Sequence, residues 1–163
     1  PSSAFTWLTA AWPSVGSDRA VNVVAALARR FEGCRLRPYL CPAGVPTIGY
    51  GATFYPGGIR VELTDPPITK QIADDMLLHS VRTIYLPAVA RLCPSIDTPG
   101  RLAAIIDFTF NLGSGSLRAS TLRRRINAGR WNDVPKELRK WVKGGGKVLR
   151  GLAIRREAEA ALI

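Results

Sequence analysis

The sequence predicts an α+β fold in which a small β-sheet lobe stands beside a mainly helical lobe. Residues 35–62 contain five glycines and four prolines, a composition typical of short strands joined by turns. Outside that stretch, apolar residues recur at the three- to four-residue spacing of helices. We expect a single domain over 1–163, with the β lobe at about 33–65 and the helical lobe at about 66–163 plus a helix at 17–31.

The helices that flank the β lobe have recognisable start signals. Ser17 is a candidate N-cap for the helix at 17–31, whose apolar residues fall on one face. A second helix is expected at about 69–85, with Thr69 as its N-cap. Pro87 is expected to end or kink it, because proline lacks the backbone N–H that a helix interior requires.

The rest of the chain is predicted to be helical. Thr98 followed by Pro99 is a cap-then-proline start, and the body that follows, LAAIIDFTF, is apolar nearly all round. Such a helix is expected to be buried at the centre of the helical lobe. Three glycines at 144–146 break the chain, and the further helices are expected at 120–129, 131–141 and 151–162.

Charge is distributed unevenly. The chain carries a net charge of +11; residues 1–117 have 10 basic and 8 acidic side chains, whereas residues 118–163 have 13 basic and 4 acidic ones. A basic half indicates a polyanionic partner, which can be nucleic acid, an anionic membrane surface or an anionic cell-wall polymer. No nucleic-acid-binding motif is present, so no specific nucleic acid is expected. No apolar run reaches the roughly 20 residues of a membrane span.

The three cysteines leave at least one thiol without an intramolecular partner. Cys34 and Cys41 bracket the turn-prone hexapeptide RLRPYL and can meet in a disulfide, which fits an oxidising compartment. Three free thiols would fit a reducing one. Cys93 is either a partner in thiol exchange or a buried spectator. His79 is the only histidine, so neither a metal site nor a histidine-dependent nucleophile is expected, and no cofactor is predicted.

Glu32 lies where the first helix is expected to end. The helix dipole disfavours negative charge there, which favours the protonated carboxyl that a general acid needs. The alternative is a surface acid paired with Arg35 or Arg37, whose positive charge acts in the opposite direction.

The residues that follow Glu32 resemble a family signature. Glu32, Cys41 and Thr47 form the spacing Glu-x8-Cys-x5-Thr, inside EG-x-RL-x-x-Y and at the start of TIGYG. This pattern resembles the phage-type lysozymes of glycoside hydrolase family 24, and the similarity continues in FNLGSGSLRASTLRRRINAG at 110–129 and GGKVLRGLAIRREAEAAL at 145–162. The resemblance implies a lysozyme-like fold and an endolysin that hydrolyses the β-1,4 bond between N-acetylmuramic acid and N-acetylglucosamine, which releases phage progeny by lysing the host.

The resemblance also implies roles for these three residues. Glu32 matches the general acid and Thr47 matches the threonine that holds the attacking water, in an inverting reaction. Cys41 stands where most members carry an aspartate base and a subset carries cysteine. A thiol with a pKa of about 8.5 is only a few per cent thiolate at pH 7, and Arg35 and Arg37 are expected to lower that pKa. The alternative is that Cys41 is an apolar filler in a catalytically impaired peptidoglycan-binding protein.

Further expectations follow from the same resemblance. A Cys34–Cys41 disulfide would silence the enzyme reversibly, and an N-terminal signal-arrest-release segment would export it to the host periplasm and cell wall. Bacterial peptidoglycan is the expected partner of a monomer, with an anionic membrane surface as a second contact. The side chains expected to bind substrate are Phe110, Asn111 and Trp141, with a core position as the alternative, and Arg155 and Arg156. The two arginines are expected to reach Glu32 or the glycan, with a solvated helix face as the alternative.

Overall fold

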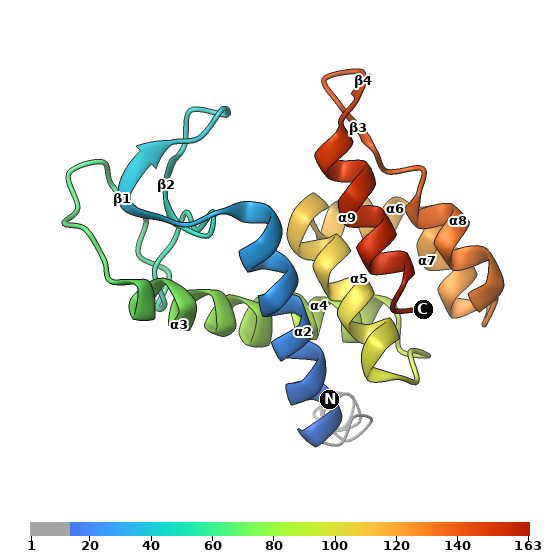
Figure 1. Cartoon of the computed structure of the whole chain (residues 1–163). Helices are drawn as coiled ribbons and strands as arrows, with labels where there is room; N and C mark the ends of the chain where they lie inside the picture. Colours follow the sequence, from blue (N-terminus) through green and yellow to red (C-terminus); the bar gives the residue numbers. More distant parts are fainter. Residues whose placement is uncertain (1–13) are drawn as a thin grey trace.

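The computed structural model describes residues 14–163 and confirms the predicted α+β fold (Figure 1). An antiparallel pair of strands, β1 (Arg35–Leu40) and β2 (Pro46–Gly49), forms the small lobe. Helix α2 (Ser14–Glu32) leads into this lobe and packs along the helical lobe, so it joins the two. None of the helices within residues 14–163 is both long enough and apolar enough to cross a membrane.

The ends of α2 differ in how well they were predicted. The helix already begins at Ser14, so Ser17 lies in its first turn and the prediction of Ser17 as N-cap is wrong. Serine is a good cap but also a tolerable helix residue, and the helix extends past it. The other end lies at Glu32, and Gly33 follows with a φ of 66°, a left-handed conformation that favours glycine and ends the helix.

The β lobe is held by a short ladder and a few apolar contacts. Tyr39 pairs with Thr47, and a bulge interrupts β1 between Arg35 and Tyr39. A small buried cluster of Ile48, Val61 and Met76 fixes the lobe to the helix that follows. Gly49 has a φ of 64°, a left-handed conformation that favours glycine. A β-carbon there would make only an ordinary contact, 3.6 Å from Cβ of Ala73, so the backbone conformation and not the space selects glycine.

That helix is longer than predicted. Helix α3 (Lys70–Ser80) begins at the predicted cap, because the Thr69 side chain accepts a hydrogen bond from the Ile72 N–H. It then continues through a π-helical turn, η1 (Val81–Tyr85), into α4 (Leu86–Leu92). Pro87 does not end the helix; it lies in the first turn of α4, directly after the π-helical turn, and such turns accommodate local irregularity in a helix.

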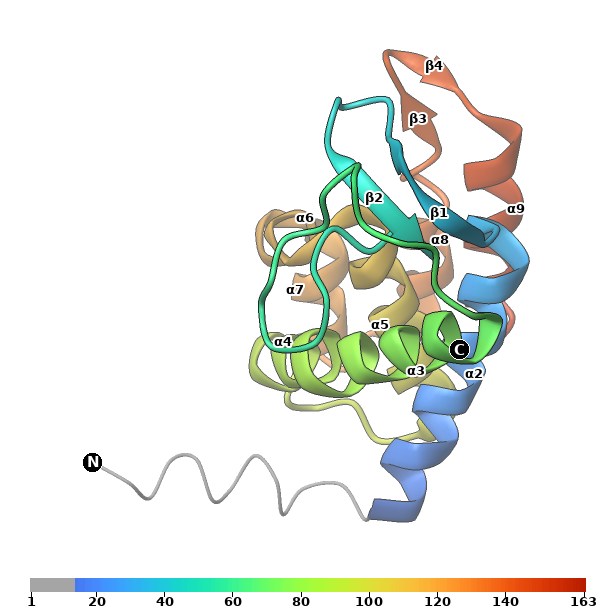
Figure 2. The same cartoon turned by 90° about the vertical axis from the view of Figure 1, so that its left-hand side faces the viewer.

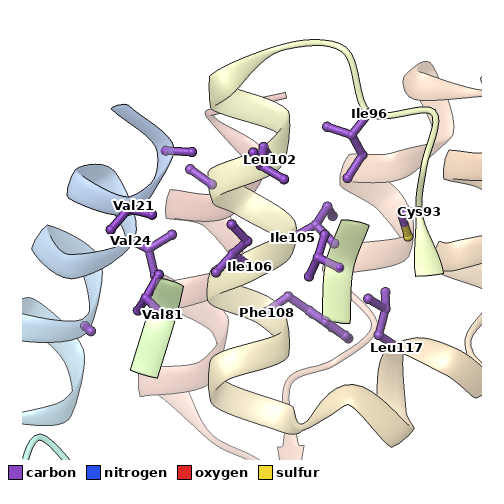
Figure 3. Close-up of a cluster of buried hydrophobic side chains, with 14 of the residues drawn as sticks. Val21, Val24, Val81, Cys93, Ile96, Leu102, Ile105, Ile106, Phe108 and Leu117 are labelled. Carbon is purple, nitrogen blue, oxygen red and sulfur yellow. The ribbon is translucent and has the colours of Figure 1, made fainter. Parts of the chain in front are cut away.

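Helix α5 (Pro99–Leu112) is the buried central helix that the sequence predicts. Thr98 accepts a hydrogen bond from the Arg101 N–H, and all residues from 102 to 109 are buried. Figure 3 shows its apolar side chains meeting Val21 and Val24 of α2, with Val81 and the Cys93 thiol nearby in the same core.

The C-terminal part contains two features that the sequence did not predict. Helix α6 (Ser114–Ala119) follows α5 after Gly113, and the glycine triplet forms the turn of a hairpin between β3 (Lys143–Gly144) and β4 (Lys147–Val148). Figures 1 and 2 show this hairpin and the β1–β2 hairpin projecting at the same end of the molecule. The remaining elements are α7 (Thr121–Asn127), the 3₁₀ turn η2 (Trp131–Asp133), α8 (Val134–Leu138) and α9 (Arg150–Ala160).

Candidate active site

A cleft of about 470 Å³ separates the β lobe from α3 and η1. Residues 49–58, which begin at the end of β2, line one side, and residues of α3 and η1, among them Leu77 and Tyr85, line the other. Glu32, Phe110 and Asn111 complete the lining. The cleft therefore brings the end of α2 and the end of α5 together with the turn after the TIGYG motif.

Glu32 is held in this cleft by an arginine far along the chain. Its Oε1 accepts a hydrogen bond from Nη1 of Arg155 on α9, and its side chain is 26% exposed. The alternative partners were Arg35 and Arg37; Arg35 instead lies over the ring of Tyr39 at 4.4 Å. The expected pairing of Glu32 with an arginine of the β lobe is therefore wrong.

The other oxygen of Glu32 faces the glycine-rich turn. A β-carbon at Gly51 would lie 3.9 Å from Oε2, and Gly51 has a φ of 88°, which disfavours any other residue. The TIGYG turn thus brings its backbone close to the carboxyl group without covering it with a side chain.

Arg155 is almost completely buried and is fixed on several sides. Its Nε and Nη2 donate to the two oxygens of Asp107 on α5 at 2.8 and 2.9 Å. The rings of Phe31 and Phe110 lie 5.4 and 6.0 Å from the guanidinium carbon. Burial lowers the pKa of Arg155, but the opposing effect of Asp107 and Glu32 is larger and raises it overall, so the side chain stays charged. The prediction that Arg155 reaches Glu32 agrees with this geometry.

Arg156 points elsewhere. It is fully buried, and its Nη2 donates to Oδ1 of Asn111 at 2.8 Å and to Oε1 of Glu159 at 2.7 Å. Burial lowers the pKa of Arg156 and raises that of Glu159. The sequence predicted a substrate contact for Arg156, but in this structure the side chain is covered and instead orients a cleft residue, Asn111.

Two of the three other predicted substrate-binding residues lie in the cleft. Phe110 and Asn111 line it, and Phe110 packs against Tyr85 with ring centroids 5.1 Å apart. Trp141 lies edge-on to Phe108 at 5.3 Å, packed against the hydrophobic core. Trp141 does not line the cleft, so the alternative of a core position agrees with the structure and the expected substrate contact does not.

Cys41 and Thr47 lie beside each other at the end of the β1–β2 hairpin that is away from α2, and neither is among the residues that line the cleft. Thr47 is buried, and its hydroxyl donates to the Val45 carbonyl at 2.8 Å. Hydrogen bonds from the backbone of Val45 and Ala43, with a smaller one from the Thr47 hydroxyl, lower the pKa of the Cys41 thiol. The lowering was expected, but it comes from these local hydrogen bonds and not from the nearby arginines.

The cysteines are all free thiols in this structure. Cys34 directly precedes β1 and Cys41 directly follows it, and a six-residue strand spans roughly 20 Å before allowance for its bulge. Because a disulfide needs α-carbons within about 7 Å, the expected Cys34–Cys41 bond cannot coexist with β1. Cys93 is 1% exposed, and burial raises its pKa to about 12, which makes it a spectator and not an exchange partner.

Sequence reasoning missed two groups that position the site. Asp107 lies in a stretch for which the sequence predicts only an apolar, buried helix. Its charge is itself a signal, because a lone acid in a buried helix requires a partner. Asp74 on α3 accepts hydrogen bonds from Nε of Arg29 at 3.0 Å and from the Tyr50 hydroxyl at 2.9 Å. The Arg29 contact, more than the one from Tyr50, lowers the pKa of Asp74, and together the three residues fasten the TIGYG turn to α2 and α3.

Comparison with known proteins agrees with this arrangement. The phage lysozyme family model matches residues 29–159. An endolysin of Bacillus phage B103 is 33% identical over 154 residues, which is 90% of this chain and 52% of that protein. The SAR-endolysin of Escherichia phage P1 is 33% identical over 160 residues, 90% of this chain and 82% of that protein.

Solved structures share the fold. The endolysin from Escherichia coli O157:H7 phage FAHEc1 superposes with a TM-score of 0.74 at 29% identity, covering 88% of this chain and 89% of that one. The chain spans about half the length of the Bacillus phage endolysins that it matches. The family match extends from the last turn of α2 almost to the end of α9, and so includes Glu32, the β hairpin and Arg155. The chain therefore belongs to the phage lysozyme family.

Proposed function

We propose that this protein is an endolysin that hydrolyses the β-1,4 glycosidic bond between N-acetylmuramic acid and N-acetylglucosamine in bacterial peptidoglycan. The observation that carries the proposal is the position of Glu32, a partly exposed carboxyl group in a cleft of about 470 Å³, held by a buried arginine. The names of the family relatives, endolysin and SAR-endolysin, support the same activity.

The proposed reaction is a direct displacement by water. Glu32 gives its proton to the glycosidic oxygen as the bond to the anomeric carbon breaks. Thr47 holds a water whose oxygen attacks that carbon from the opposite face, and the Cys41 thiolate takes up the proton that the water loses. Attack from the opposite face inverts the anomeric centre, so the first product is the α-anomer. After proton donation, Arg155 stabilises the carboxylate that remains on Glu32.

A redox control of this activity is a further part of the proposal. A bond between Cys34 and Cys41 would consume the base and would also require β1 to come apart, because the strand separates the two thiols. Oxidation would thus inactivate the β lobe as a whole. Reduction by a thiol other than Cys93 would restore it, since Cys93 lies in the core.

The proposed place of action is the host periplasm and cell wall. Several relatives are named SAR-endolysins, which supports export by a signal-arrest-release segment. The excess of 13 basic over 4 acidic side chains in residues 118–163 suits the anionic peptides of peptidoglycan and an anionic membrane surface. We propose that the protein acts as a monomer.

One alternative function has an observation in its favour. Cysteine at the base position is compatible with a protein that binds peptidoglycan without cleaving it. Digestion of purified peptidoglycan, followed by mass spectrometry of the soluble fragments after borohydride reduction, separates the two. Fragments ending in reduced N-acetylmuramic acid support the glycosidase; retention of the protein on intact peptidoglycan without released fragments supports the binding protein.

A further inference from the structure

The guanidinium of Arg155 is shared by two carboxyl groups. Asp107 occupies Nε and Nη2, and Glu32 accepts from Nη1. Asp107 is fully buried, the Arg155 side chain is 4% exposed, and Glu32 is the partner open to the cleft. The two-point contact with Asp107 therefore fixes the plane of the guanidinium, and one edge remains for Glu32.

Within residues 14–163, the surroundings of Arg155 offer its guanidinium no other charged partner. Phe31 and Phe110 lie near the guanidinium, and the next arginine, Arg156, is committed to Asn111 and Glu159. Without the two hydrogen bonds to Asp107, the guanidinium could rotate and donate to both oxygens of Glu32. Its charge would then be balanced by Glu32 alone.

That balance matters because a general acid must hold a proton before it donates one. When Glu32 is protonated it no longer compensates Arg155, and a buried cation without a counter-charge is strongly unfavourable. Asp107 supplies the missing counter-charge in both protonation states of Glu32. The cost of protonating Glu32 is thereby reduced.

We propose that Asp107 is a positioning residue for the glycosidase reaction: it holds Arg155 to a single contact with Glu32 and balances its charge, so that Glu32 can carry the proton it donates. The inference rests on the proposed function. Asp107 does not line the cleft and acts only through Arg155.

Other charged and titratable groups face this cluster. Glu159 and Arg156 of α9 lie near Asp107, and Tyr85 of η1 lies near Glu32. Burial raises the pKa of Glu159 to about 9, which keeps its carboxyl group neutral at neutral pH. It therefore does not replace Asp107 as the counter-charge.

The test compares the isosteric variant Asp107→Asn with the double variant Asp107→Asn/Arg155→Gln. Asp107→Asn removes the counter-charge and so favours loss of the proton from Glu32. Because activity falls at high pH when the general acid loses its proton, the alkaline limb of the pH profile of peptidoglycan hydrolysis should move down by about one pH unit or more. The double variant also removes the cation, so its alkaline limb should return to the wild-type position or above it. Asp107→Ser should shift in the same direction as Asp107→Asn. Glu137→Gln is the matched control, because Glu137 is also buried and paired with a cation, Lys140, at 2.8 Å; its profile should not move.

A second readout does not depend on activity. The carbon-13 titration midpoint of the Glu32 carboxyl group should fall in Asp107→Asn and recover in the double variant. If Asp107→Asn leaves both the limb and the midpoint unmoved, or if the double variant keeps the shift, Asp107 is only a structural partner and the proposal is wrong. Absence of hydrolysis by the wild-type protein would contradict the proposed function, while the titration would still decide the role of Asp107.

Discussion

Cys34 and Cys41 flank strand β1, one immediately before it and one immediately after it. The strand pairs with β2, and β2 carries Thr47 and leads into the turn that faces Glu32. A covalent bond between the two cysteines is therefore in direct competition with the fold of the β lobe. A redox switch at these two thiols would therefore act by unfolding β1 and not by joining two residues within an intact fold.

The first prediction is that oxidation at these thiols unfolds β1. Mild oxidation should produce a species with Cys34 and Cys41 joined, detectable by mass spectrometry after alkylation without reduction. In that species the amide hydrogens of β1 should lose their protection from exchange, and peptidoglycan hydrolysis should be lost until reductant is added. Cys34→Ser should be insensitive to the same treatment. A disulfide-bonded species with β1 still protected would contradict the geometry described here.

The second prediction concerns the base. A base works only when deprotonated, and an aspartate titrates at about 4 whereas a thiol titrates at about 8.5. Local hydrogen bonds lower the pKa of Cys41, but the wild-type acid limb should still lie above that of Cys41→Asp. The rate of peptidoglycan hydrolysis measured from pH 4 to pH 9 should show Cys41→Asp active further into acid, with Cys34→Ser as the thiol control. Identical acid limbs in the two proteins would mean that Cys41 is not the base.

The third prediction concerns Asn111. Arg156 donates to its Oδ1, so its amide nitrogen is free to face the cleft and donate to a substrate oxygen. Asn111→Asp keeps the acceptor for Arg156 but replaces the donor. We expect KM for soluble peptidoglycan fragments to rise about tenfold or more with little change in kcat, whereas Asn132→Asp on the exposed surface should leave both unchanged. An unaltered KM would show that the amide makes no substrate contact.

The fourth prediction concerns stability and Glu159. Burial raises the pKa of Glu159 to about 9, well above its value of about 4.5 in an unfolded chain. Between these values the folded state binds more protons than the unfolded state, so this group's contribution to the free energy of unfolding is lost as pH rises. Glu159→Gln removes the titration, and its Tm should therefore vary less between pH 5 and pH 9 than that of the wild type. If Tm changes with pH equally in both proteins, the proton that the folded state binds is not on Glu159.

Much of the fold was readable from local signals. Thr69, Thr98 and Ser120 each cap a helix where the sequence predicts one, because a cap is a contact within three residues of the chain. The expectation that Pro87 ends its helix failed for the complementary reason. The effect of a proline directly after a π-helical turn depends on the surrounding structure, which residue propensity alone does not contain.

Part of the candidate site was likewise predictable from a short stretch of sequence, whereas the rest depends on contacts between distant residues. Glu32, Cys41 and Thr47 were proposed as site residues because one short stretch resembles the phage-type lysozymes. The contact between Arg155 and Glu32 joins residues 123 positions apart, and its buried end, Asp107, lies in a helix that reads as wholly apolar. Trp141 and Arg156 were expected to bind substrate from the family resemblance, but neither lines the cleft: Trp141 is partly buried against the core, and Arg156 is fully buried.

The most direct test of the account is the activity of Glu32→Gln against purified peptidoglycan. The amide oxygen can still accept a hydrogen bond from Arg155, so the variant should keep the wild-type circular dichroism spectrum and Tm, yet it has no proton to give to the glycosidic oxygen. The measurement is the rate at which new N-acetylmuramic acid reducing ends appear. We expect a rate at least about a hundredfold below that of the wild type, because general acid catalysis contributes a factor of this order. A folded Glu32→Gln that releases reducing ends at the wild-type rate would contradict the assignment of Glu32 as the general acid.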